Sequence, residues 1–424
     1  MSNQVFVTGM GIITGLGIGK EENLQAIFNH KTAIEKIRFL KSKHTELPAA
    51  EVKYTNEELC DLLNIDKNEV STRTSLIGRI ALKEALEEAK ITYSRHCEER
   101  RDEAIQPKHK DCFAVAHNDG ISIAFINGTT VGGMDKSEQF YLEFLDENNN
   151  SKNKYIESHD CGTTTELIAQ QFDGNFDCMT TISTACSSAL NAVILGANLI
   201  KTGQADIAIV GGTECISKFH FNGFNTLMIL DKEQCRPFDK TRTGLNLGEG
   251  AAYLVLESEK SVKNRNIKPL CKLLGYSNTC DAFHQTATSP DGIGATLAMK
   301  KAIEKSNLTP KDIDYINAHG TGTDNNDLTE GIAIMNVFEN DIPNVSSLKS
   351  FLGHTTSAAG SVEAVISILA MLNNFIPASL NFNTKIDELS FIPNKENILN
   401  AKINTLLTNS FGFGGNDTAC VFTK

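Results

Sequence analysis

One cysteine of this chain stands where a turn from a strand into a helix would present it. Cys186 lies in the small-residue stretch Thr-Ala-Cys-Ser-Ser-Ala at residues 184–189, between an apolar strand and an apolar helix. A thiol at such a turn faces the positive end of the helix dipole, where unpaired backbone N–H groups lower its pKa and can hold an oxyanion. The pattern predicts a nucleophile, although a buried structural cysteine at a helix start has the same signature.

Two histidines lie among glycines and threonines further along the chain. His319 follows a short apolar strand in Asn-Ala-His-Gly-Thr-Gly-Thr, at the strand end where α/β active sites gather. His354 stands at the start of the next apolar helix, five residues after Lys349. A single histidine is more often structural. A cysteine with two neutral histidines, however, suits acyl-thioester chemistry, in which the thiol attacks and ring N–H groups stabilise an enolate or oxyanion.

A glycine-rich stretch near the C-terminus is the last candidate for chemistry. Residues 409–416 read Asn-Ser-Phe-Gly-Phe-Gly-Gly-Asn, so that small residues surround Phe411 and Phe413. Such a bend presents backbone N–H groups while the two rings wall a pocket. An ordinary glycine-rich hairpin is the alternative interpretation of this stretch taken alone.

The elements that must position these residues alternate between strand and helix. Short apolar strands are predicted at residues 4–9, 121–127, 205–212, 253–257 and 314–319, and helices at 75–89, 186–202, 294–306, 328–338 and 358–373. This alternation predicts an α/β fold with helices covering the sheets. Residues 181–202 and 346–373 resemble each other, which indicates two related halves that meet near residue 262.

Composition narrows the class of protein. The chain has 424 residues and a net charge of −12, which argues against binding to a nucleic-acid backbone. It contains no 18-residue uncharged apolar run, so no membrane span is expected. The eleven cysteines form no Cys-x-x-Cys pair, which indicates reduced cytoplasmic thiols and no metal site. A densely charged stretch at 93–119 is predicted to be an exposed insertion without catalytic residues.

Together, these motifs resemble the β-ketoacyl-acyl-carrier-protein synthases of the type I/II branch of the thiolase-like superfamily. The likeness extends over nearly the whole chain, through residues 7–14, 127–133, 236–239 and 248–251. It implies an α/β, thiolase-like fold with a five-layered α-β-α-β-α core of two pseudo-duplicated halves. Residues 1–262 would form the half that carries the nucleophile, and residues 263–424 the half that carries both histidines.

The resemblance also implies a role for each residue of the candidate site. Cys186 would take the acyl chain from a carrier protein, with the N–H groups of Cys186 and Phe413 as the oxyanion hole. His319 and His354 would promote decarboxylation of malonyl-carrier protein and stabilise the enolate. The enolate would then attack the acyl-Cys186 carbonyl and extend the chain by two carbons. Lys349 would support the electrostatics of the second histidine.

Further residues follow from the same resemblance. Glu330 matches a structural carboxylate near the lysine. Thr321 and Thr323 would bind the phosphopantetheine arm, and the acyl chain would meet the gating ring of Phe413 together with Phe411, Val131 and Phe224. No cofactor is implied beyond the phosphopantetheine that the carrier protein supplies. The implied partners are an acyl carrier protein and a second copy in a cytoplasmic homodimer, or a related subunit in a heterodimer.

Several alternatives remain open at this stage. A thiolase would need a second cysteine in place of the Phe-Gly-Phe-Gly-Gly stretch, and the nearest one, Cys420, falls in a predicted core strand. The Cys-His-Asn branch would place an asparagine at His354. A cysteine hydrolase would leave the second histidine and its lysine unexplained. A non-catalytic chain-length-factor-like subunit is disfavoured because Cys186, His319 and His354 are all present.

Departures from the common pattern concern docking and chain length. The usual Arg-Asp-Gly is Arg-Thr-Gly at residues 242–244, and the loop at 223–230 lacks a common arginine. These features resemble specialised condensing enzymes that make aryl-polyene or flexirubin-like pigments. An acidic carrier protein also requires a local basic patch on this acidic chain. The candidates for that patch are Arg73, Arg79 and Lys232.

Overall fold

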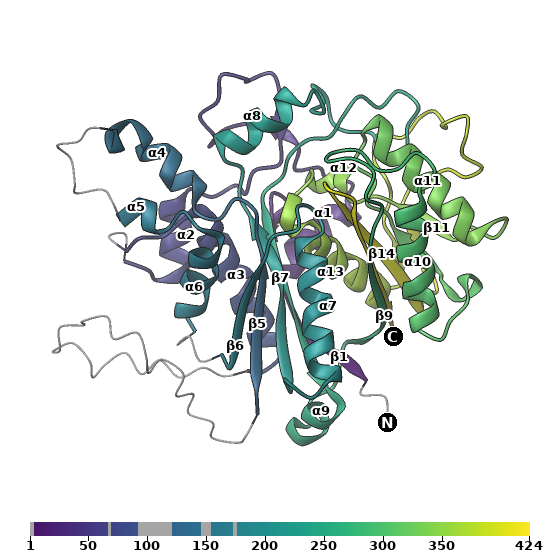
Figure 1. Ribbon diagram of the computed structural model, residues 1–424, viewed down its shortest axis with the longest axis horizontal. Helices are drawn as coiled ribbons and strands as arrows, with labels where there is room; N and C mark the ends of the chain where they lie inside the picture. Colours follow the sequence, from purple (N-terminus) through teal and green to yellow (C-terminus); the bar gives the residue numbers. More distant parts are fainter. Residues whose placement is uncertain (1–3, 67–68, 92–120, 146–153, 173–175) are drawn as a thin grey trace.

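The computed structural model describes the chain at residues 4–66, 69–91, 121–145, 154–172 and 176–424 (Figure 1). The insertion predicted at 93–119 lies outside these described residues. Among the helices that are described, none combines the length and the apolar character that crossing a membrane requires.

Two groups of five strands repeat one topology. The first group runs in the order β1-β8-β7-β5-β6 and the second in the order β9-β15-β14-β10-β11. In each group the last three strands are parallel neighbours and the other pairs are antiparallel. The strands are β1 (Val5–Thr14), β5 (Ile123–Gly128), β6 (Cys178–Ile182), β7 (Ile207–Glu214), β8 (Gly250–Ser258), β9 (Cys271–Cys280), β10 (Tyr315–Asn317), β11 (Asn344–Ser346), β14 (Thr405–Gly412) and β15 (Asn416–Thr423). The repeat confirms the predicted duplication.

The two groups join where β1 pairs with both β8 and β9. Helices α7 (Ser188–Lys201) and α13 (Ala359–Leu372) lie between the sheets, and their side chains form one apolar cluster with the inner sheet faces. A second cluster lies under α3 (Arg73–Glu88) and α6 (Cys161–Gln170), and a third under α10 (Ile293–Lys305) and α11 (Asp324–Phe338). The order is therefore outer helices, sheet, central helices, sheet and outer helices. These are the five layers expected from the resemblance.

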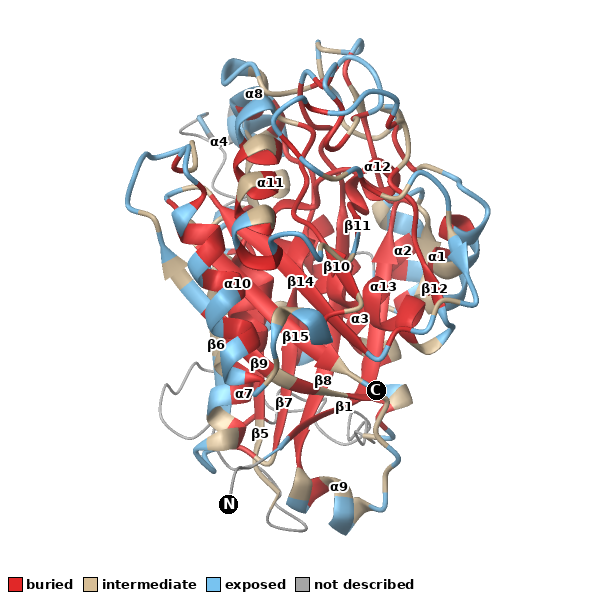
Figure 2. Cartoon of the chain, turned by 90° about the vertical axis from the view of Figure 1, so that its right-hand side faces the viewer, coloured by how far each residue is buried: buried red, intermediate tan, exposed pale blue. Residues whose placement is uncertain are grey.

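The central position of α13 follows from its sequence. Thirteen of its residues are buried, and its Ala-Gly-Ser-Val-Glu-Ala-Val-Ile pattern has no polar stripe. A helix that is apolar on all sides is stable only when protein surrounds it. Gly360 lets it approach α7 closely, since a Cβ there would stand 2.8 Å from the Cβ of Leu190. Figure 2 shows this interior in red, while most exposed residues lie on the outer helices, the loops and the edge strand β6.

Shorter elements complete the chain. The helices are α1 (Gly19–Phe28), α2 (Asn56–Leu63), α4 (Met134–Phe144), α5 (Lys154–Glu157), α8 (Lys218–Thr226), α9 (Glu259–Arg265) and α12 (Lys349–Leu352), with 3-10 turns η2 (Pro310–Asp312) and η3 (Thr356–Ala358). The two-residue strands are β2 (Gly17–Ile18), β3 (Glu35–Lys36), β4 (Pro48–Ala49), β12 (Phe375–Ile376) and β13 (Ile398–Leu399). Residue 262, the predicted boundary, falls inside α9, and the division at this residue stays a prediction.

Candidate active site

Cys186 occupies the turn that leads from β6 into α7. Ala185 holds a left-handed backbone with φ 52°, which costs energy for a residue other than glycine and is found where surrounding structure imposes it. Ser188 fixes the turn, because its Oγ accepts a hydrogen bond from the N–H of Thr184 at 2.9 Å and donates one to the carbonyl of Ala185. The result is a rigid turn whose thiol is buried at the floor of a cavity.

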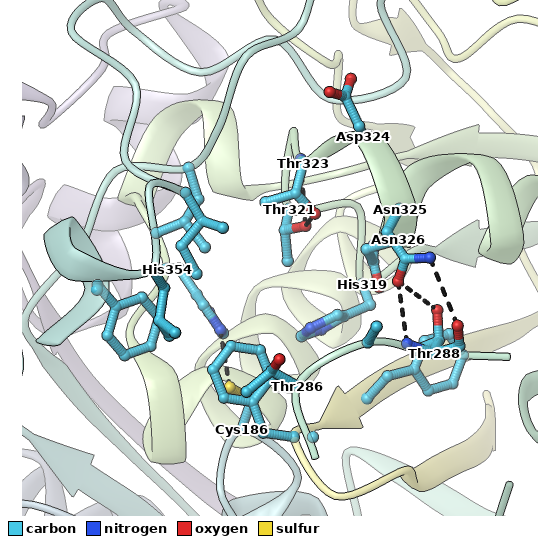
Figure 3. A pocket seen from close by; sticks show the side chains of 18 of the residues that line it. Cys186, Thr286, Thr288, His319, Thr321, Thr323, Asp324, Asn325, Asn326 and His354 are labelled. Carbon is cyan, nitrogen blue, oxygen red and sulfur yellow. Dashed lines mark hydrogen bonds between the residues drawn. The ribbon is translucent and has the colours of Figure 1, made fainter. Parts of the chain in front are cut away.

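Both predicted histidines reach the same cavity from the second half of the chain (Figure 3). His319 follows β10 and His354 follows α12, and their ring centroids lie 5.3 Å apart at 83°. Nε2 of His354 lies 3.0 Å from Sγ of Cys186. The structure therefore brings together the three residues that the sequence singled out. Cys186 and His319, the nearer of the two histidines in the sequence, are more than 130 residues apart.

Lys349 contacts the first histidine. Its Nζ lies 3.3 Å from Nδ1 of His319 and also donates to the His319 carbonyl. An ammonium group can only donate, so Nδ1 of His319 acts as acceptor and Nε2 carries the ring hydrogen. The sequence had assigned the lysine to the second histidine. Its direct contact is instead with His319, while its charge still acts on the pKa of His354.

The carboxylate that pairs with this lysine is one that the sequence analysis missed. Glu363 on α13 places Oε1 2.5 Å from Nζ of Lys349, and both side chains are almost fully buried. Glu330, which was expected near the lysine, accepts the backbone N–H groups of His319 at 2.8 Å and Gly320 at 2.7 Å. Glu330 thus fixes the backbone of the loop that carries His319. Glu363 reaches the lysine through the packing of α13, and it does not stand in a local sequence motif.

The ionisation of the site differs from the sequence-based prediction. Burial raises the pKa of Cys186 to about 12, although the charge of Lys349 and the N–H of Phe413 act in the opposite direction. The expected lowering of the thiol pKa is therefore wrong, because loss of water outweighs the donors at the turn. Burial, together with the nearby ammonium, also holds the pKa values of His319 and His354 well below the usual range. The resting site is a neutral thiol facing neutral imidazoles.

The glycine-rich stretch packs directly on the nucleophile turn. Oγ of Ser410 donates to the carbonyl of Cys186 at 2.9 Å. A Cβ at Gly412 would stand 2.7 Å from the carbonyl oxygen of Thr184, so only glycine allows this approach. The next residue, Phe413, aims its backbone N–H at the sulfur of Cys186. The stretch therefore packs on the site, and it is at the same time the turn of the hairpin that β14 and β15 form.

The cavity has a volume of about 320 Å³ and a lining that is partly polar and partly apolar. The polar residues include Thr321 and Thr323, whose Oγ atoms lie 2.9 Å apart. The apolar residues include the stacked rings of Phe224 and Phe413, and also Phe411, whose ring lies beside His319. The polar residues suit a flexible arm with amide groups, and the apolar residues suit a hydrocarbon chain.

Val131 is the predicted pocket residue that this cavity does not include. Its side chain is 3% exposed and packs in the cluster under α3, and its N–H donates to Glu214 at 2.9 Å. The adjacent Gly132 and Gly133 form a tight turn into α4, which directs Val131 into the core. Val131 is therefore not among the residues that line this cavity, and its predicted role in substrate binding stays a prediction.

Two of the three basic residues expected to dock a carrier protein are internal. Arg73 is 8% exposed and forms a two-point ion pair with Glu249 at 2.8 and 2.7 Å. Arg79 is 1% exposed and donates to the carbonyl of Leu167. Only Lys232 is on the surface. Sequence alone did not show that twelve of the sixteen residues of α3 are buried.

The described part of the chain brings together no set of three histidine, cysteine or carboxylate side chains placed to hold a metal ion.

Sequence comparisons agree with this geometry. The profile described as "Beta-ketoacyl synthase, N-terminal domain" matches residues 2–261, and the profile described as "Beta-ketoacyl synthase, C-terminal domain" matches residues 270–383. The chain is 31% identical to 3-oxoacyl-[acyl-carrier-protein] synthase 2 of Coxiella burnetii over 99% of this chain and 98% of the relative. It is 29% identical to the protein of the same name in Staphylococcus aureus, over 100% and 99% of the two chains.

Solved structures give the same result for the fold. A chain of the ishigamide ketosynthase/chain length factor superposes with a TM-score of 0.86 at 27% identity, covering 100% of both chains. A structure of a ketosynthase in complex with its chain length factor from Xenorhabdus doucetiae superposes with a TM-score of 0.80 at 27% identity, covering 99% and 98%.

Proposed function

Because this chain belongs to the β-ketoacyl synthase family, we propose that Cys186, His319 and His354 carry out its decarboxylative condensation. The protein is a 3-oxoacyl-[acyl-carrier-protein] synthase, an acyltransferase of fatty acid or polyketide synthesis. The observation that supports these residue roles is the convergence of one thiol and two neutral imidazoles, with one imidazole 3.0 Å from the sulfur. The same sulfur is among the atoms that line the cavity with its polar and apolar side chains.

The first step is transfer of the acyl group to Cys186. The neutral thiol donates its hydrogen to Nε2 of His354 as sulfur attacks the thioester carbonyl. The N–H groups of Cys186 and Phe413 stabilise the oxyanion. Collapse of the tetrahedral intermediate breaks the bond to the carrier's sulfur, and His354 returns the proton to that thiolate. Proton transfer in the same step avoids a free thiolate, which burial makes costly.

The second step is decarboxylation of malonyl-carrier protein. Its carbon–carbon bond electrons move into the thioester, carbon dioxide leaves, and an enolate oxygen remains. His319 donates from Nε2 to this oxygen, because Lys349 already occupies its Nδ1. His354 provides a second donor in the tautomer that carries its ring hydrogen on Nε2, which forms when solvent removes the Nδ1 hydrogen and supplies one to Nε2 after acylation. Two neutral donors stabilise the charge that develops.

The third step joins the two groups. The enolate carbon attacks the acyl carbonyl on Cys186, and the oxyanion hole again holds the developing charge. Collapse releases the β-ketoacyl-carrier protein and the Cys186 thiolate, which takes up one proton from solvent. The chain is longer by two carbons, and the thiol–imidazole pair is restored.

Thr321 and Thr323 bind the phosphopantetheine arm in this proposal, and Phe224, Phe411 and Phe413 face the acyl chain. The arm belongs to the carrier protein, and no other cofactor is required. The partner is an acyl carrier protein, since relatives of this chain are named for that substrate.

A cytoplasmic homodimer completes the proposal. Strand β6 supports a dimer because it is a sheet edge with exposed residues, and an open edge can pair with another chain. A heterodimer with a related subunit is the alternative, supported by relatives solved as ketosynthase and chain length factor. An aryl-polyene or flexirubin-like pathway remains a further proposal, for which the sequence departures are the only support.

The test separates the two half-reactions. His319→Ala should lower release of carbon dioxide from malonyl-carrier protein at least 100-fold while Cys186 is still acylated. His354→Ala should lower both the release of carbon dioxide and the acylation of Cys186, because this ring accepts the thiol proton and donates to the enolate. His30→Ala, which removes a histidine at a surface contact with Glu396, is the matched control and should keep both rates. Normal decarboxylation by His319→Ala would contradict the assignment, as would loss of acylation alone.

A further inference from the structure

Helix α8 carries a histidine that the proposed mechanism does not use. His220 lies one turn before Phe224, and the two rings meet edge to face with centroids 4.9 Å apart. The Phe224 ring in turn stacks on Phe413 at 5.8 Å and 19°. The backbone N–H of Phe413 points at the sulfur of Cys186. Phe413 and Phe224 therefore connect the nucleophile to His220 through consecutive contacts.

The ring of His220 has one unused acceptor. Its Nδ1 is buried and has no hydrogen-bond partner within the described part of the chain. The carbonyl of Cys215 lies within hydrogen-bonding reach of the ring, so Nε2 carries the hydrogen and Nδ1 presents a lone pair. Burial lowers the pKa of this histidine, which keeps it neutral near pH 7. An unpaired buried acceptor is energetically unfavourable, and a ligand that donates a hydrogen bond to it would remove that cost.

Among the described residues, no polar group forms a hydrogen bond with Nδ1 of His220. Glu214 is the closest carboxylate that acts on His220, but its oxygens accept from Thr129, Thr130 and Val131 instead. His354 also lies within electrostatic range and uses its Nε2 for Cys186. The lone pair of Nδ1 is therefore available to a group that enters from outside the chain.

The acyl chain needs room beyond the cavity as it stands. A volume of about 320 Å³ is at the small end for a cavity that holds one ligand, and here a carrier arm and an acyl chain must both fit. A chain could extend beyond the apolar lining where Phe224 and Phe413 stack, if the ring of Phe413 moved away from Phe224. Glycine lies on both sides of Phe413, and a Cβ at Gly414 would meet no atom within 4 Å.

We infer that His220 is a specificity-determining residue that accepts a hydrogen bond from a hydroxyl group on the acyl chain. The chain passes between Phe413 and Phe224 as Phe413 moves aside, and its hydroxyl hydrogen reaches Nδ1. The site thus selects hydroxyl-bearing acyl groups over plain alkyl groups of equal length. This assignment rests on the proposed function, since it needs an acyl group on Cys186.

The experiment compares hydroxyacyl- and alkanoyl-carrier protein of equal chain length as primers, with malonyl-carrier protein as the extender. The readout is the ratio of the two kcat/KM values for β-ketoacyl product. His220→Leu should lower that ratio about 10-fold, the effect of one hydrogen bond to a buried acceptor. His220→Asn keeps an acceptor in the side chain and should retain more of the preference. His30→Asn, at a surface ion pair with Glu396, is the control.

The outcomes separate the two levels of the proposal. No product from either primer with the wild-type protein would overturn the proposed function, and this assignment with it. Product from both primers with an unchanged ratio in His220→Leu would overturn the role of His220 alone. An equal fall in the ratio for the Leu and Asn variants would also overturn it, since packing rather than hydrogen bonding would then explain the effect.

Discussion

At the residue scale, the chemistry of the cavity depends on charges that are buried together. Lys349 and Glu363 form an ion pair whose members are 1% and 2% exposed, and the lysine also holds Nδ1 of His319. A buried pair of this kind adds little net stability, yet removing one member leaves the other charge without compensation. The pair therefore sets the orientation and hydrogen position of the histidine more than it stabilises the fold.

Lys349→Met should destabilise the protein by about 3–5 kcal/mol, because the carboxylate of Glu363 would be left buried and unpaired. It should also lower decarboxylation, since nothing would then fix the hydrogen of His319 on Nε2. Denaturant unfolding and carbon dioxide release measure the two effects. The double variant Lys349→Met/Glu363→Gln should recover most of the stability and none of the activity. Wild-type decarboxylation by the double variant would contradict the role of the lysine.

A second buried acid makes stability depend on pH. Burial raises the pKa of Asp417 to about 8, with Asp281 and Glu330 adding repulsion, and its Oδ1 has no partner among the described residues. A folded-state pKa above the unfolded value near 3.8 means that stability is fully present below that value and is lost as the pH rises towards 8. Asp417 therefore opposes folding most strongly in mildly alkaline solution.

Asp417→Asn should stabilise the protein, because the amide carries no charge. The gain in unfolding free energy should grow from pH 4 to pH 8 and reach at least about 1 kcal/mol at the upper end. Denaturant titrations of both proteins at several pH values give this difference. A gain that is constant over the whole range would show that ionisation of Asp417 does not cause it.

Sequence patterns identified the reacting groups but not the residues that hold them. Cys186 and His319 stand in short motifs whose glycines and small residues are required locally, so their positions could be predicted. Glu363 stands inside an apolar helix with no motif of its own, and only the packing of α13 against the histidine loop gives it a role. Arg73 was expected on the surface as part of a basic patch. It is instead buried, and the carboxylate of Glu249 compensates its charge inside the protein.

At the element scale, the site depends on the close approach of the β14–β15 hairpin to the turn before α7. The contact lies at Gly412, where a Cβ would stand 2.7 Å from the Thr184 carbonyl and 2.9 Å from Oγ of Ser187. Neighbouring side chains strengthen the contact, since Oδ1 of Asn416 accepts from Ser187 and from Asn191 on α7. The hairpin therefore packs tightly on the turn at Gly412 and Asn416.

Gly412→Ala should separate these two elements and lower the rate of Cys186 acylation at least 10-fold, because the N–H of Phe413 would move away from the sulfur. Stopped-flow transfer from acyl-carrier protein measures that rate. Gly162→Ala on α6 is the matched control, since a Cβ there meets no atom within 4 Å. An unchanged rate in Gly412→Ala would mean that the hairpin does not position the oxyanion hole.

The main helices and strands could be predicted from periodicity, because α7, α10 and α13 and the strands beside them have long apolar runs. The pairing of β1 with both β8 and β9 could not, since it depends on contacts between distant segments. Val131 illustrates the same limit. Its motif was recognised, but the direction of its side chain depends on the turn that follows it.

At the scale of the whole molecule, each half supplies what the other lacks. The first half provides Cys186 and the second half provides His319 and His354, so neither half contains the site alone. The net charge of −12 does not locate the surface that the proposed carrier protein would contact, because Lys232 is the only one of the three basic candidates left on the surface.

The exposed edge of β6 should form the dimer contact. Met179 on this strand is 40% exposed, and a charge there would oppose pairing of the edge with another chain. Met179→Lys should therefore shift the protein to monomer in sedimentation velocity at micromolar concentration. Lys311→Glu, a charge change on η2, should leave the oligomeric state unchanged. A wild-type dimer that persists in Met179→Lys would place the interface elsewhere.

Covalent acylation of Cys186 is the step on which the other assignments depend. Intact-protein and peptide mass spectrometry after incubation with acyl-carrier protein tests it directly. The mass of one acyl group should appear on the peptide that contains Cys186 and disappear when malonyl-carrier protein is added, as β-ketoacyl product forms. An acyl group on a different cysteine, or the same adduct and product from Cys186→Ala, would contradict the mechanism.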